Sequence, residues 1–244
     1  MEKGGMPMAG YDLAPLTGRL MELSDRDYAQ FNQTLTPTAQ GAIMGVRVPL
    51  LRGIAREIVR EADWRDFLDA TRESPVFEMK MLHAMALGYA RCGAEERLRL
   101  IDAFLPHIGD WAVCDTLVST YKPRGGDLDP VFQFARECAQ TDIEFRKRFG
   151  LVLLMSRFHD APYLEGTLAV YRAFRHEGYY ARMGAAWGLA TLWLYAREAC
   201  LSILEENLWD PFTHNRAIQK LCESYRISDE DKALARSLRR KREA

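Results

Sequence analysis

Charged side chains recur along this chain at an interval of about 34 residues, the length of one helical hairpin in a repeat protein. The positions 47, 80, 115, 148, 183 and 216 are separated by 33, 35, 33, 35 and 33 residues. They are occupied by Arg47, Lys80, Asp115, Arg148, Met183 and Arg216. In a stack of helical hairpins, equivalent positions line up on one concave wall. Five of these six positions carry charge, so the spacing predicts an all-α solenoid with one carboxylate in a mostly basic row.

Apolar residues return at helical spacing from residue 11 onward, and short breaks containing Pro or Gly separate the helical segments. A first helix is expected near 13–23 and a second after the capping pair Ser24-Asp25. The other predicted helices are 46–60, 63–71, 77–92, 95–105, 110–121, 131–140, 142–158, 163–175, 178–196, 199–206, 213–225 and 228–242. Short loops favour antiparallel neighbours, so we expect about six antiparallel helical pairs.

The segment 1–10 precedes any periodic pattern and contains adjacent glycines and a proline. We expect it to be a flexible leader, followed by a single repeat domain over 11–244. The longest apolar run, 183–196, is too short for a membrane span and is typical of a buried core helix. Without a signal peptide or CxxC pair, the five cysteines indicate reduced thiols in a cytoplasmic protein.

The net charge of −1 predicts no polyanionic partner from bulk electrostatics alone. Binding of nucleic acid depends instead on where the positive charges cluster. The five histidines are dispersed, and no HxxxH, HExxH or glycine-rich phosphate-binding motif is present. The sequence therefore predicts neither a metal site nor a cofactor.

Trp111 and Asp115 lie four residues apart, so they share one face of their predicted helix. A carboxylate within a basic wall can stabilise positive charge that develops on a sugar when a glycosidic bond breaks. The alternative is structural, with Trp111 in the core and Asp115 capping a helix or pairing with an arginine. Cys114 points about 100° away from Asp115 on the helix, so we expect it to be buried.

Trp187 follows Met183 at the same four-residue spacing. Its ring either packs in the core or forms an aromatic wall that contacts deoxyribose or holds a cation. The run 146–148, which contains Lys147 and Arg148, is either a solvated face or a set of phosphate contacts.

Six segments of the chain, 45–52, 111–115, 146–148, 180–187, 213–220 and 223–226, together resemble the HEAT-like-repeat DNA alkylation repair proteins. This family contains the AlkD-like alkylpurine DNA glycosylases of bacteria, and the resemblance covers about residues 20–240. It implies HEAT-like repeats around a concave basic cleft, with Asp115 as the catalytic carboxylate and Trp111 and Trp187 flanking the sugar of the lesion. The segment 35–44 departs from the family pattern, so no N-terminal aromatic contact is assigned.

The predicted DNA-binding residues are those of the basic row and its neighbours: Arg47, Lys80, Lys147, Arg148, Arg182, Arg216 and Lys220. The resemblance implies a monomeric bacterial enzyme, in the cytoplasm and on the nucleoid, that excises cationic N3- or N7-alkylated purines from duplex DNA without flipping the base. Two alternatives remain: a DNA-binding repeat protein without catalysis, and a helical scaffold that binds other proteins.

Overall fold

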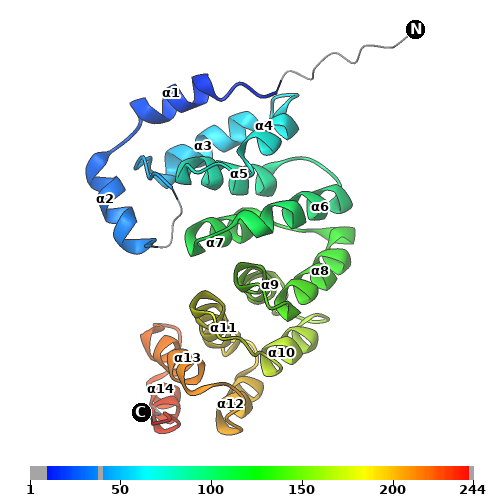
Figure 1. Cartoon of the computed structure of the whole chain (residues 1–244). Helices are drawn as coiled ribbons and strands as arrows, with labels where there is room; N and C mark the ends of the chain where they lie inside the picture. The colour runs from blue at the N-terminus through cyan, green and yellow to red at the C-terminus, as the bar shows by residue number, and fades with distance from the viewer. Residues whose placement is uncertain (1–9, 38–40, 242–244) are drawn as a thin grey trace. The chain divides into compact units, whose positions relative to one another are not determined.

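The structure is a computed structural model that describes residues 10–37 and 41–241. Its α-helices are α1 (Ala14–Glu22), α2 (Arg26–Leu35), α3 (Val48–Ile58), α4 (Trp64–Thr71), α5 (Phe77–Tyr89), α6 (Ala94–Phe104), α7 (Trp111–Thr120), α8 (Leu128–Gln140), α9 (Glu144–Arg157), α10 (Leu164–Arg172), α11 (Tyr179–Leu192), α12 (Arg197–Glu205), α13 (Pro211–Glu223) and α14 (Asp229–Ser237). Two short 3-10 helices, Leu105–His107 and Gly125–Asp127, precede α7 and α8. The described residues contain no strand, so the all-α prediction is confirmed (Figure 1).

Every predicted helical segment contains a helix, and the largest differences lie at C-terminal ends. The segment predicted over 178–196 is helical only as far as Leu192, and the one predicted over 228–242 ends at Ser237. The predicted cap Asp25 accepts a hydrogen bond from the Tyr28 amide at 3.0 Å and so begins α2. Most of the predicted leader lies outside the described residues.

The chain divides into two compact units, Met1–Gly93 with Leu100–Tyr121, and Ala94–Arg99 with Lys122–Ala244. The single domain expected over 11–244 therefore stays a prediction. Within each unit the odd-numbered helices pack against one another in chain order, which is compatible with a solenoid of helical repeats.

In the first unit α3, α5 and α7 run parallel. At their starts, the Lys80 ammonium of α5 donates to the His107 carbonyl just before α7, at 3.0 Å. At their ends, a Cβ added to Gly88 of α5 would lie 2.1 Å from Oγ1 of Thr120 in α7. The glycine therefore allows the two helices to approach closely where they end.

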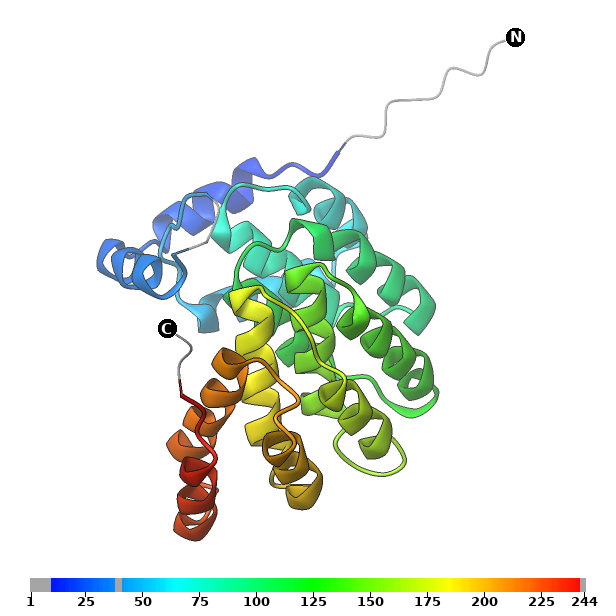
Figure 2. The ribbon, with the colours of Figure 1, turned by 60° about the horizontal axis from the view of Figure 1, so that its bottom comes forward.

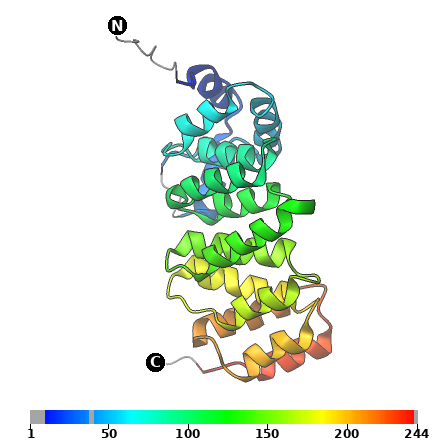
Figure 3. The ribbon, with the colours of Figure 1, turned by 90° about the vertical axis from the view of Figure 1, so that its right-hand side faces the viewer.

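In the second unit α9, α11 and α13 form the corresponding row. Figure 2 shows α13 (orange) between α11 (yellow) and α14 (red). Figure 3 shows the helices of this unit stacked from α8 and α9 (green) to α12 and α14 (orange and red). Helix α8 packs closely on α9, since a Cβ added to Gly150 would meet the Ala135 carbonyl oxygen at 2.5 Å. The apolar run of α11 is largely buried, as expected, and no helix among the described residues is long and apolar enough to cross a membrane.

His83 of α5 is buried in the core of the first unit. Its Nδ1 lies 3.0 Å from the Thr71 hydroxyl, which donates to the Phe67 carbonyl, so Nδ1–H donates to Thr71. Its ring stacks on Phe104 with the centroids 3.9 Å apart. Burial lowers the pKa of His83 to about 3, because the imidazolium would lose its hydration.

Acid is therefore expected to destabilise the protein through His83. The pKa in the folded protein lies below the ordinary 6.5, so the contribution is present above pH 6.5 and is lost as pH falls toward 3. At pH 5 the loss should reach about 2 kcal/mol in the free energy of unfolding. Urea unfolding at several pH values checks this, with His83→Leu as the variant that cannot titrate. An equal pH dependence in both proteins would contradict the assignment.

Candidate functional site

Helix α7 presents Trp111 and Asp115 on one partly exposed face. The helix begins at Trp111 because the carboxylate of Asp110 accepts the Val113 amide at 3.0 Å. Trp111 donates from Nε1 to the Leu35 carbonyl at the end of α2, with a separation of 2.9 Å. The indole is therefore held against α2 and does not fill the core. Cys114 is fully buried, as predicted.

Burial raises the pKa of Asp110. The Val113 and Ala112 amides and the charge of Lys80 act in the opposite direction, while the nearby charge of Asp115 raises the pKa further. Asp110 therefore caps α7 and interacts electrostatically with two residues of the predicted site, Lys80 and Asp115.

Lys80 does not present its ammonium on an open surface. The side chain is buried, its Nζ donates to the His107 carbonyl, and burial lowers the pKa of Lys80. Contact with a DNA phosphate would require Lys80 to leave this carbonyl. Its placement supports a role in holding the segment that enters α7.

Arg47 is exposed immediately before α3. Its guanidinium donates to the Asp25 carboxylate at 2.7 Å and lies over the Tyr28 ring, 4.7 Å from the centroid. Tyr28 in turn stacks on Phe31, an exposed aromatic of α2. The sequence did not point to these two rings as site residues, and the contact between α2 and Trp111 is not visible in the residue pattern.

In the second unit Lys147 repeats the arrangement of Lys80. Each is the fourth residue of its helix, and each ammonium donates to the carbonyl four residues before the next odd-numbered helix. The Lys147 bond reaches the Arg175 carbonyl at 2.7 Å. Burial lowers the pKa of Lys147 as it does that of Lys80. Lys147 is thus also placed to hold a loop, which the expectation of a solvated or phosphate-binding run did not include.

Arg148 is buried between α9 and α11, where Nη1 donates to the Tyr180 carbonyl at 2.9 Å. A Cβ added to Gly184 would lie 3.4 Å from Cγ of Arg148, so the arginine stem crosses α11 at this glycine. Trp187 lies one turn further along α11 and is 40% exposed. Of the two interpretations of Trp187, the exposed ring favours an aromatic surface over core packing.

Three further predicted DNA-binding residues lie at α11 and α13. The guanidinium groups of Arg182 and Arg216 both lie over the Phe212 ring, 4.4 and 5.2 Å from its centroid. Arg182 also pairs with Asp210 at 3.7 Å. Lys220 pairs with Glu223 at 2.7 Å, on the partly exposed side of α13. These cations are partly accessible, and those of Arg182 and Lys220 each pair with a carboxylate.

The structure corrects the register of the predicted row. The fifth residues of the odd-numbered helices from α3 to α13 are Arg52, Met81, Asp115, Arg148, Met183 and Asn215. Arg47 precedes its helix, Lys80 is a fourth residue and Arg216 a sixth. One residue rotates a side chain by about 100°, so Arg47, Lys80 and Arg216 are offset from the other three predicted positions when each is counted from the start of its helix. Numbering each helix from its capping residue, and not by a fixed interval, would have identified Arg52 as the α3 residue equivalent to Asp115.

Among the described residues no group of three or more His, Cys, Asp or Glu side chains is arranged to hold a metal ion. The search of curated proteins returned no match. Residues 16–221 match the family described as DNA alkylation repair enzyme. The match covers most of the chain and includes Trp111, Asp115, Arg148 and Trp187. The chain therefore belongs to the DNA alkylation repair enzyme family.

Proposed function

We propose that this protein is a DNA glycosylase that excises N3- and N7-alkylated purines from duplex DNA. The observation that carries the proposal is the partly exposed face of α7, where Asp115 lies one turn from a tryptophan whose indole is anchored to Leu35. A fixed ring next to a carboxylate suits a flat, cationic or electron-poor group. The family membership supplies the class of substrate.

Cleavage of the N-glycosidic bond of an alkylated purine requires only modest stabilisation of the transition state by the protein. Alkylation at N3 or N7 gives the purine a positive charge, so the C1′–N bond can break with the electron pair leaving on a neutral base. Positive charge then develops on the deoxyribose, and water adds to C1′ while its proton passes to Asp115 or to solvent. A carboxylate about 4 Å from that charge contributes ~4 kcal/mol at an effective dielectric constant of ~20.

This stabilisation corresponds to roughly a thousandfold in rate. It is sufficient for a cationic leaving group and far too small for a normal base. Selectivity can therefore come from the leaving group, without a pocket that reads or flips the base. We infer that the protein acts on the nucleoid in the cytoplasm and contacts the deoxyribose of the lesion while the base remains stacked in the duplex.

The accessible cations of the predicted set are proposed to contact phosphates: Arg47, Arg182, Arg216 and Lys220. Such contacts are independent of sequence and weaken with salt. Lys80, Lys147 and Arg148 already donate to backbone carbonyls, and we propose that they act by positioning the segments around α7 and α11.

Release of 3-methyladenine or 7-methylguanine from methylated duplex tests this function, and Trp187→Ala tests the aromatic contact. Loss of the exposed ring should lower both single-turnover release and affinity for lesion-containing DNA by roughly tenfold, since an aromatic contact contributes about 1 kcal/mol or more. Tyr225→Ala is the control for an exposed aromatic ring, because Tyr225 follows α13 and is not among the predicted site residues.

A wild-type protein that binds duplex but releases no alkylated base would instead support the binding-only alternative. If Trp187→Ala and Tyr225→Ala behave alike, Trp187 is not part of the DNA contact.

A further inference from the structure

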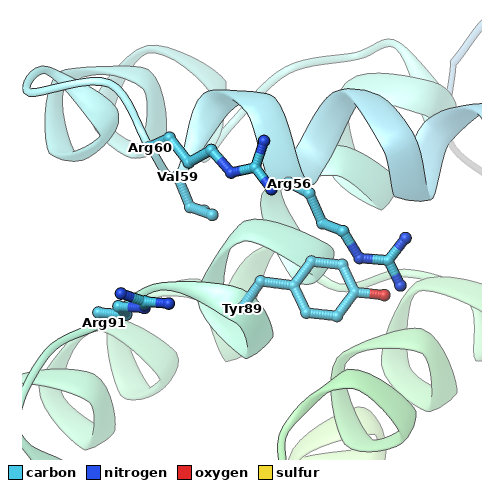
Figure 4. Close-up of a pocket in the computed structure, with 5 residues that line it drawn as sticks. All are labelled: Arg56, Val59, Arg60, Tyr89 and Arg91. Atoms are coloured by element: carbon cyan, nitrogen blue, oxygen red, sulfur yellow. The ribbon is translucent and has the colours of Figure 1, made fainter.

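An arginine-rich pocket of about 520 Å³ lies between the C-terminal ends of α3 and α5. It is lined by Arg56, Val59, Arg60, Tyr89 and Arg91 (Figure 4). Arg56 projects from α3 toward Tyr89 of α5, and its guanidinium lies 5.0 Å from the centroid of that ring. The lining contains three cations and no carboxylate, which is the composition of an anion site.

Tyr89 is oriented by a further arginine. Nη1 of Arg52 donates to the Tyr89 hydroxyl at 2.8 Å. The phenol oxygen therefore accepts one bond and keeps its own O–H as a donor for a ligand in the pocket. Arg52 thus adds a fourth positive charge at the edge of the pocket.

Among the described residues, no acid forms a salt bridge with Arg56, Arg60 or Arg91. The one acid of α3, Glu57, pairs with Arg19 at 2.5 Å. The charge of Arg60 contributes to the lowered pKa of Glu57, after the hydrogen bond from Arg19 and its charge. Arg56 and Arg91 are therefore the cations most available to an outside anion.

The pocket lies on the same face of the first unit as the proposed catalytic pair. Trp111 and Asp115 are the first and fifth residues of α7. Arg52 and Arg56 are the fifth and ninth of α3, and Tyr89 is the thirteenth of α5. Positions four apart follow one ridge along a helix, and these three helices are parallel and packed in order.

The separation suits a second contact with the same duplex. From a fifth to a thirteenth residue the helix rises about 12 Å, and adjacent helices lie about 9 Å apart, so Asp115 of α7 and Tyr89 at the α5 side of the pocket are roughly 15 Å apart. The major groove of B-DNA is about 12 Å wide. A duplex whose sugar faces Asp115 can thus present a phosphate to the pocket.

We propose that the pocket formed by Arg56, Arg60, Tyr89 and Arg91 binds a backbone phosphate of duplex DNA. This inference deepens the proposed function, since it rests on a duplex that contacts the Asp115 face. The structural alternative is that the arginines only stabilise the C-terminal ends of two helices. That role affects stability and leaves DNA affinity unchanged.

The test compares two charge-matched double variants on undamaged duplex. The first double variant combines Arg56→Gln and Arg91→Gln and removes two cations of the pocket. Arg99→Gln with Arg124→Gln removes two exposed cations that do not line the pocket. Affinity is measured by fluorescence anisotropy between about 50 and 300 mM salt. The pocket variant should lose roughly tenfold in affinity per arginine, and its salt slope should flatten by about 0.9 for each. The control should change by less than about threefold in total.

Equal behaviour of the two double variants would overturn the proposal. So would unchanged DNA affinity in a pocket variant that has lost binding of inorganic phosphate, because the pocket would then serve a small anion. Circular dichroism checks folding, and Arg91→Gln alone decides the matter if the double variant unfolds. Undamaged duplex separates this inference from catalysis. If the wild-type protein releases no alkylated base but the pocket variant binds undamaged duplex less tightly, the phosphate pocket is supported and the glycosylase proposal is not.

Discussion

Replacing Asp115 by Asn is expected to slow the release of 7-methylguanine by roughly two to three orders of magnitude. The amide keeps the size of the side chain and removes the negative charge that would face the developing cation. The figure follows from the ~4 kcal/mol attributed to a carboxylate at about 4 Å. DNA affinity should stay the same or rise, because a negative charge near phosphates has been removed. Single-turnover base release from methylated duplex measures the effect.

The matched control is Asp160→Asn, since Asp160 is exposed and its carboxylate lies 3.7 Å from Nε2 of His159, outside the predicted site. Its release rate should equal that of the wild type, and circular dichroism should show both variants folded. An Asp115→Asn enzyme as fast as wild type would remove the carboxylate from the mechanism.

The largest effect on stability is expected from Glu78. This side chain is fully buried at the start of α5. Its carboxylate accepts the backbone amides of Met44, Gly45 and Val46, with the shortest contact 2.7 Å to Gly45. Glu78→Ala removes the acceptor of all three donors and leaves a cavity. The free energy of unfolding should fall by about 3–5 kcal/mol.

Urea unfolding followed by circular dichroism checks the value. Glu198→Ala is the control, because Glu198 is exposed and pairs with Arg197 on the surface, where an ion pair contributes less than about 1 kcal/mol. Glu78→Gln keeps one carbonyl oxygen and should be intermediate. A Glu78→Ala protein within 1 kcal/mol of wild type would show that the 44–46 segment does not depend on this carboxylate.

The helices could be predicted from the sequence because their signals are local. Asp25 caps α2 as expected, and Pro49 lies in the first turn of α3. The burial of Cys114 followed from one residue of rotation relative to Asp115. C-terminal ends were less well predicted, since α11 stops at Leu192 although its apolar pattern continues to residue 196.

The same rotation explains what the sequence reasoning missed. Lys80 and Lys147 are fourth residues of their helices, the position that Cys114 occupies in α7, and all three are buried. A fixed interval of 33 or 35 residues cannot identify equivalent helix positions to within one residue, because the loops between the helices differ in length. The donors to His107 and Arg175 are also invisible to a residue pattern, since the acceptors are backbone carbonyls. The pocket at Arg56 and Arg91 depends on the parallel packing of α3 and α5, which no local signal encodes.

The two buried lysines also bear on how each unit loses its structure. Each ammonium of Lys80 and Lys147 joins one helical pair to the loop that starts the next pair. These two hydrogen bonds therefore stabilise the interface between adjacent repeats and not either repeat alone. In a linear array, cooperativity rises as interface terms grow relative to intrinsic ones. Within a unit, separating two repeats exposes a lysine and a carbonyl together, so fraying from one end is disfavoured and neighbouring repeats unfold in concert.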